Sequence, residues 1–295
     1  MSKPLSELLN FWHIEDNGIM VYKDGSMGAA LKIKGVDPSC KTNDEINSLT
    51  RSVENLITSL PDGVKVQFFY EVNSDVSQRL RQHKIIQGNP HVNYQKVLDF
   101  RCDSLDRLAS EGKLTQDTCY LFLRDRSINL NKKSFLSSPK KLQRISFEEF
   151  EGRVSDLKNI LNFCVSQLGA GNIESELVSQ GEWVNLLYGF FNLDRKNILG
   201  EIALKENTLL DQTPFVDQLA LSDIDSCRDY IRIGENYFKI INIGTLPESM
   251  TFAGMINFLT DLPFHFKLSQ TFEILDQTKE HEKLQVARRL AASMA

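Results

Sequence analysis

The residues most able to bind a charged partner are basic and lie close together between positions 124 and 144. This segment carries one acid, Asp125, and is interrupted by Ser137-Ser138-Pro139. Its charge could contact the phosphates of nucleic acid or of anionic lipid. A solvated linker between domains has the same composition, and we favour that interpretation because charge blocks are commonly loops or tails. The residues that could contact an anionic partner are Arg124, Arg126, Lys132, Lys133, Lys140, Lys141 and Arg144.

Catalytic and cofactor-binding motifs are missing from the sequence. It has no G-x-x-x-x-G-K-[ST] phosphate loop, no G-x-S-x-G nucleophile elbow and no H-E-x-x-H helix. The five histidines fall in different predicted elements without the spacing of metal ligands. Carboxylate pairs such as Asp103/Asp106 lie on predicted helices, where solvent exposure explains them. We therefore predict that this chain is not an enzyme, with no catalytic, cofactor-binding or metal-binding residue.

Composition indicates an ordinary globular protein of 295 residues, with 41% hydrophobic and 25% charged residues. A formal net charge of −5 disfavours a general nucleic-acid binder, which needs concentrated Lys and Arg. Five scattered cysteines without a C-x-x-C pair fit free thiols in a reducing compartment. We find no secretory signal and no run long enough to span a bilayer. The expectation is a cytoplasmic protein that contacts a membrane at most peripherally.

The elements that would position these residues begin with a hairpin over 18–33, turned by Asp24-Gly25. A helix over 43–60 follows, opened by a capping box of Thr42 and Glu45. Alternating apolar residues predict a strand over 64–72, and a continuous apolar run predicts a central strand over 117–123. Two helical stretches, 75–83 and 92–108, lie between these strands. The order β-β-α-β-α-β favours a sheet built from split β-α-β crossovers, broadly ferredoxin-like.

A helix opening at Ser146 carries a heptad-like apolar seam that needs a partner helix. The apolar stretch 182–191 is our preferred partner, and another protein is the alternative. Near the C-terminus, a hairpin over 230–243, a helical stretch from Pro247, a strand over 264–274 and a last helix repeat the earlier order. That last helix, 279–294, is expected to turn Leu284, Ala287, Leu290 and Ala291 inward.

The predicted fold is thus α+β, with two ferredoxin-like split β-α-β blocks joined by a helical segment. The predicted domains are a first sheet-and-helix block over 1–126, a basic linker and helical segment over 127–228, and a second, incomplete block over 229–295. Because the chain ends inside a helix without a stop signal, we expect the intact gene product to continue beyond it.

The N-terminal run from Phe11 to Ser26, FWHIEDNGIMVYKDGS, resembles the start of the large ATPases of bacterial conjugation and type IV secretion, especially the TraC type. In that family, the N-terminal domain opens with a tryptophan. An acidic residue then precedes a glycine and three apolar residues, and D-G-S follows. The later hairpin at Gly234-Glu235-Asn236-Tyr237 and the Leu246-Pro247 step are similar to the second half of the same domain.

The resemblance implies a non-catalytic assembly and docking domain at the cytoplasmic face of the inner membrane. Its implied partners are secretion-channel proteins and copies of itself. ATP is implied only for a C-terminal domain, because no Walker motif occurs in this sequence. Two other hypotheses stay open: a nucleic-acid-binding module that uses the basic loop 124–144, and a small-molecule sensor that would need a pocket.

Overall fold

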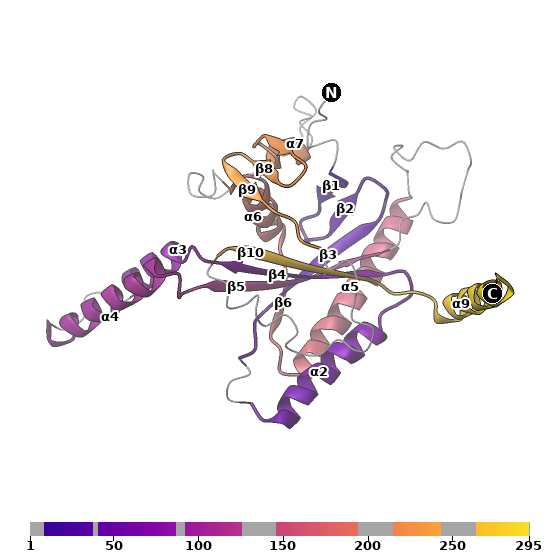
Figure 1. The fold of residues 1–295 in the computed structure, drawn as a ribbon, viewed down its shortest axis with the longest axis horizontal. Helices are drawn as coiled ribbons and strands as arrows, with labels where there is room; N and C mark the ends of the chain where they lie inside the picture. The colour runs from indigo at the N-terminus through magenta and orange to yellow at the C-terminus, as the bar shows by residue number, and fades with distance from the viewer. Residues whose placement is uncertain are drawn as a thin grey trace.

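The computed structural model describes residues 9–37, 41–86, 92–125, 146–193, 215–242 and 264–294 of the chain. This part of the protein is mixed α+β, with a seven-stranded sheet, a three-stranded sheet and seven helices. The α+β class predicted from the sequence is therefore confirmed. Figure 1 shows the larger sheet at the centre of the molecule, with helices on both of its faces.

The large sheet has the order β1-β2-β3-β5-β4-β10, and every neighbouring pair is antiparallel. A short seventh strand, β6, pairs with the C-terminal half of β3, while β2 pairs with its N-terminal end. The strands are β1 Phe11–Ile14, β2 Met20–Tyr22, β3 Met27–Ile33, β4 Lys65–Asn73, β5 Gln116–Arg124, β6 Ser175–Leu177 and β10 Phe266–Glu273.

Two crossover connections in this sheet are split. Helix α2 (Asn43–Thr58) connects β3 to β4, and β5 lies between those two strands. Helix α5 (Phe147–Ala170) connects β5 to β6, and β3 lies between them. The helix that follows the basic segment therefore returns to the same sheet. Helix α5 and strand β6, which fall within the predicted basic linker and helical segment 127–228, thus pack on the same sheet as the first block.

The first core lies between α2, α5 and one face of the sheet. Alternate residues of β3, such as Leu31, meet Leu56 of α2 and Leu161 of α5 there. The heptad-like seam of α5 thus packs against α2 and β3, where Leu157, Leu161, Cys164 and Leu168 are buried. The predicted pairing of this seam with residues 182–191 was wrong, because those residues lie on the other face of the sheet.

The second core covers that opposite face with α6 (Gln180–Phe191) and α7 (Phe215–Leu219). Ala30, which alternates with Leu31, contributes to this core together with Trp183. The indole Nε1 of buried Trp183 donates a hydrogen bond to the carbonyl oxygen of Gly18 at 2.9 Å. A sheet with two apolar faces explains why β5 is a nearly continuous apolar run.

The predicted second block is divided between the two sheets. Its hairpin, β8 (Ile231–Ile233) and β9 (Asn236–Phe238), pairs with β7 (Ile224–Ser226) in the three-stranded sheet. Its long strand, β10, instead pairs with β4 along its full length. This register places Phe272 beside Phe68 in the first core, with ring centroids 6.2 Å apart. Burial of that aromatic pair explains why β10 extends the first sheet rather than building a second one. The helix predicted from Pro247 lies outside the described residues.

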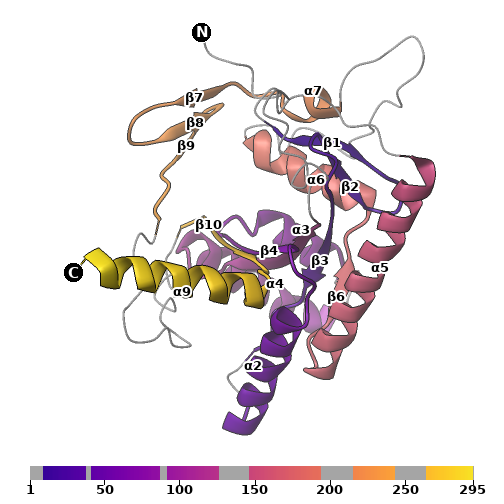
Figure 2. The same ribbon diagram turned by 90° about the vertical axis from the view of Figure 1, so that its right-hand side faces the viewer.

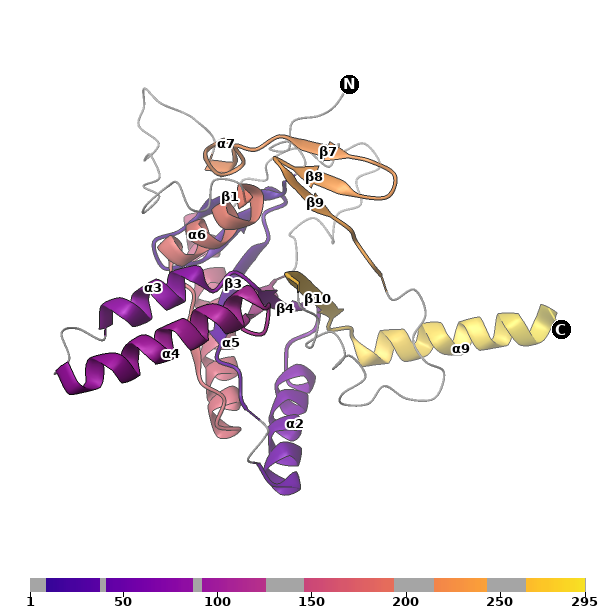
Figure 3. The same ribbon diagram turned by 60° about the vertical axis from the view of Figure 1, so that its left-hand side comes forward.

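Three further helices extend away from the sheet. Helices α3 (Ser77–Ile86) and α4 (Val92–Ser110) form a hairpin on one side of the molecule, as Figures 1 and 3 show. Helix α9 (Gln277–Met294) follows β10 and points away from the body of the chain, as Figure 2 shows. Leu284, Ala287 and Leu290 of α9 are exposed, so the prediction that they turn inward was wrong.

Candidate functional site

The β2–β3 turn holds the Asp-Gly-Ser sequence in a hydrogen-bonded loop. Oδ1 of Asp24 accepts a hydrogen bond from the Ser26 amide at 3.1 Å and another from the Ser26 hydroxyl at 2.6 Å. Gly25 has φ +76°, in the left-handed region that favours glycine. The hairpin predicted at this position from the Asp-Gly pair is confirmed. Its turn carries an acid and a hydroxyl with a fixed orientation.

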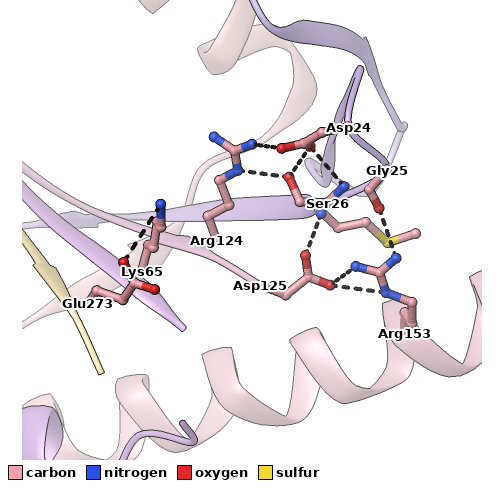
Figure 4. A network of polar contacts seen from close by, with 9 residues as sticks. Asp24, Gly25, Ser26, Lys65, Arg124, Asp125, Arg153 and Glu273 are labelled. Carbon is pink, nitrogen blue, oxygen red and sulfur yellow. Dashed lines mark hydrogen bonds and ion pairs between the residues drawn. The ribbon is translucent and has the colours of Figure 1, made fainter. Parts of the chain in front are cut away.

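Arg124, the last residue of β5, binds this turn. Its Nη2 donates to Oδ2 of Asp24 at 2.5 Å, and its Nε donates to the Ser26 hydroxyl at 2.7 Å (Figure 4). The guanidinium carbon lies 4.0 Å from the centroid of the Tyr22 ring, within cation–π range. A Cβ at Gly28 would lie 3.0 Å from the Tyr22 ring, so glycine gives this ring its space.

Asp125 makes the second half of the network. Its Oδ1 accepts from the Met27 amide at 2.6 Å, and Oδ2 accepts from Nε of Arg153 at 3.1 Å and also from Nη2 of Arg153. Nη1 of the same arginine donates to the carbonyl oxygen of Gly25 at 2.8 Å. Figure 4 shows both arginines pointing toward the turn, one from β5 and one from α5.

The two carboxylates differ in their electrostatics. Burial opposes ionisation of Asp24, but hydrogen bonds from Ser26 and the charge of Arg124 outweigh it and lower the pKa of Asp24. Burial dominates at Asp125 and raises its pKa, although the Met27 amide and Arg153 act in the opposite direction. Burial also raises the pKa of Tyr22. The partners of Asp24 therefore favour its ionised form, whereas ionised Asp125 is held in the network against an unfavourable free energy of desolvation.

These contacts join the described elements on either side of residues 126–145. Arg124 and Asp125 immediately precede these residues, and Arg153 lies near the start of the helix that follows them. Ser146 caps that helix by accepting a hydrogen bond from the Glu149 amide at 3.1 Å. Strand β5 and helix α5, which precede and follow residues 126–145, are thus both fixed to the same hairpin.

The seven predicted anion-contacting residues divide into two groups. Arg124 lies in the network, where Asp24 already pairs with its charge. The other six lie outside the described residues: Arg126, Lys132, Lys133, Lys140, Lys141 and Arg144. Sequence reasoning missed Asp24, Ser26, Asp125 and Arg153 as partners in one cluster. Its one available signal was the Asp-Gly-Ser turn, because the other partners are distant in sequence.

A second surface is formed by the α3–α4 hairpin. Tyr94, Val97 and Phe100 of α4 are exposed, at 67%, 65% and 73%, as is Ile85 of α3. Nζ of Lys84 and Oδ2 of Asp106 lie 2.7 Å apart and link the two helices. We call the exposed side chains Ile85, Tyr94, Val97 and Phe100 the hairpin patch. These side chains face solvent, which is unusual for several large apolar residues on one helical hairpin.

Histidine and cysteine chemistry is limited in the described part of the chain. No group of three or more His, Cys, Asp and Glu side chains there could hold a metal ion. Nε2 of His265 lies 2.8 Å from Oε1 of Glu71 across neighbouring strands. Burial raises the pKa of the Cys119 and Cys164 thiols to about 11. Among the described residues, no helix has the length and apolar character needed to cross a bilayer.

Comparison of the chain with models of protein families gives no match, and comparison with curated proteins gives none either.

Proposed function

We propose that this chain is a non-catalytic assembly and docking domain of a type IV secretion ATPase of the conjugative, pilus-assembling type. It binds secretion-channel proteins at the cytoplasmic face of the inner membrane and also associates with copies of itself. The hairpin patch is the observation that carries the proposal, together with the Phe11–Ser26 resemblance. The fold supports this role by holding the α3–α4 hairpin on a rigid two-core sheet.

The composition of α4 favours a protein partner for the hairpin patch. At about 100° per residue, Arg101 lies one turn from Val97 and Lys96 lies one turn from Phe100, whereas Asp99 lies on the other side of the helix. Protein interfaces are enriched in aromatic residues and arginine, and their cores are depleted of acids. The hairpin patch thus has aromatic and apolar side chains at its centre, with Lys96 and Arg101 beside them.

Co-purification with the inner-membrane channel proteins of the same transfer system tests the proposal. The wild-type chain is expected to retain them, and Val97→Ser combined with Phe100→Ser is expected to weaken binding at least tenfold. Gln95→Ser combined with Asp99→Ser is the matched control, because both exposed residues lie on the opposite side of the same helix. Equal retention by both double variants would contradict the assignment of the hairpin patch as the docking surface.

A nucleotide titration tests the non-catalytic part of the proposal. The full chain is expected to show no saturable ATP binding and no ATP hydrolysis above the buffer rate. The physical reason is that the sequence has no Gly-rich loop whose backbone amides could cradle phosphates. Tight ATP binding by the chain alone would contradict the proposal.

The alternative function is nucleic-acid binding through the basic loop 124–144. It predicts steeply salt-dependent binding of single-stranded DNA, lost when Lys132, Lys133, Lys140 and Lys141 are neutralised. The network of Arg124 with Asp24 weakens this alternative, since that guanidinium is already paired. Salt-dependent DNA binding without retention of channel proteins would replace the docking function with this one.

A further inference from the structure

Strand β10 forms one end of the large sheet. It pairs with β4 on one side, and no strand of the described chain pairs with its other edge. Its eight residues contain no proline, and Ser269, Gln270 and Thr271 at its centre are exposed. A long edge strand of this kind is a template for pairing with another strand.

The hydrogen-bond pattern shows which backbone groups face outward. The amide of Ile274 donates to the carbonyl oxygen of Val64 at 3.0 Å, so even-numbered residues here direct their backbone toward β4. The register with β4 continues without a shift from Glu273↔Lys65 to Phe266↔Val72. Because backbone direction alternates along a strand, Lys267, Ser269, Thr271 and Glu273 direct their amides and carbonyls to the outer edge.

We propose that β10 pairs antiparallel with β10 of a second copy of this chain, about a two-fold axis at Gln270. In this register, Lys267 lies opposite Glu273 of the other copy, and Leu268 lies opposite Phe272. The outward-directed residues pair with one another, and Gln270 meets its own copy at a non-hydrogen-bonded position. The inference rests on the proposed assembly function and deepens it by naming the partner and the surface.

Charge complementarity selects the second copy as the occupant of this edge. Lys65 and Glu273 are already an ion pair, with Nζ and Oε2 3.8 Å apart (Figure 4). Nζ of Lys267 lies 3.5 Å from Oε1 of Glu71 on the same face of the sheet. Pairing would join these into a row of alternating charge, running Lys65, Glu273, then Lys267 and Glu71 of the partner copy. Opposite charges placed across neighbouring strands stabilise a sheet.

The apolar residues agree with the same register. Phe272 lies beside Val66 on the face that forms the first core. Leu268, which lies beside Tyr70 on that face, would be the neighbour of Phe272 from the other copy. An apolar row would then run without interruption across β4 and β10 of one copy and β10 and β4 of the other. A shift by one residue would place these side chains on opposite faces.

Helix α9 gives a second reason for a partner at this edge. It begins at Gln277, shortly after β10, and extends away from the rest of the chain in both Figure 2 and Figure 3. Its Leu284 and Leu290 are 60% and 55% exposed. A second sheet paired along β10 would lie on the side toward which this helix extends.

Cysteine cross-linking reads the register directly. In a Cys227→Ser background, Gln270→Cys is expected to form a disulfide-linked dimer on mild oxidation, because antiparallel neighbours lie within disulfide range, at Cα distances of about 4.5–5.5 Å. Ser269→Cys and Thr271→Cys should each remain unlinked alone but should cross-link when the two variants are mixed. Self-linking of either one, or no link at position 270, would overturn the proposed pairing.

Mass measurement by light scattering tests for the dimer without any introduced cysteine. The wild-type chain at about 100 µM is expected to show twice the 33.7 kDa of one chain. Thr271→Pro removes an outward amide and should yield a monomer with unchanged circular dichroism, whereas Thr271→Ala should remain dimeric. A monomeric wild-type chain that still binds channel proteins would overturn this inference alone. A dimer that binds no channel protein would support it while contradicting the proposed function.

Discussion

Arg153 of α5 and Asp125 at the end of β5 form an ion pair across 28 positions of sequence. The side chains are only 17% and 20% exposed, and Arg153 also reaches the carbonyl oxygen of Gly25. The pair therefore ties the helix after the basic segment to the turn in front of β3. It joins strand β5 and helix α5, the two described elements on either side of residues 126–145.

Replacement of Arg153 should show the value of this pair. Arg153→Gln leaves the largely buried Asp125 without its cation, so we expect a loss of about 2–3 kcal/mol in the free energy of unfolding. The measurement is a urea titration followed by circular dichroism. Arg232→Gln is the control, because its ion pair with Asp225 is exposed and solvent-screened, so its loss should change the free energy of unfolding little. Equal losses in both variants would show that Asp125 does not need Arg153.

Acid should weaken the hairpin through Asp24. The pKa of Asp24 is lower in the folded chain than its ordinary value of 3.8, so the ionised form stabilises the fold. This contribution is fully present above about pH 5 and is lost as the pH falls through the folded pKa, below about 4. The unfolding midpoint of the wild-type chain should therefore fall further than that of Asp24→Asn between pH 5 and pH 3. Parallel pH profiles for the two proteins would contradict this role of Asp24.

Gly18 should tolerate no side chain. It has φ +79°, and a Cβ there would lie 2.2 Å from the carbonyl oxygen of Val178. We expect Gly18→Ala to cost about 3 kcal/mol or more in stability, and to change the fluorescence of Trp183, whose indole bonds to the Gly18 carbonyl. Gly152→Ala is the control, since nothing lies within 4 Å of its Cβ and it is inside α5. That variant should be neutral or more stable by about 1 kcal/mol.

The thiols should differ in reactivity according to their burial. Cys164 is fully buried and has its pKa raised to about 11, whereas Cys227 is exposed. A thiol reagent at neutral pH should therefore modify Cys227 in the folded chain and reach Cys164 only on unfolding. Mass spectrometry of labelled peptides, with and without urea, measures both rates. Rapid labelling of Cys164 in the folded chain would show that the first core, between α2, α5 and the sheet, opens to solvent.

Local elements were predictable because nearby residues decide them. Thr42 and Glu45 form the capping box that their spacing predicts, and α2 begins at Asn43, directly after Thr42. The Asp24-Gly25 turn and the strands β4 and β5 also lie within a residue or two of their predicted positions. Each of these features depends on turn chemistry or on side-chain periodicity over a short stretch.

The candidate site was less predictable. Arg124 could be identified as basic from the sequence, but its pairing with Asp24 depends on β3 and β5 being neighbours. Arg153 had no sequence signal, since it lies on a helix whose position is set by packing. The exposure of Phe100 was hidden for the same reason: it shares a helical pattern with Leu105, which is half-buried.

By itself, the sequence determined the α+β class, the turns, the helix starts and the absence of the phosphate-binding and nucleophile motifs. Tertiary structure alone decided that α5 packs on α2, that β10 joins β4, and that Asp125 and Arg153, on either side of residues 126–145, meet at one hairpin. The physical reason is that an apolar face specifies burial but not a partner. Partners are chosen by strand pairing and shape complementarity between residues far apart in the chain.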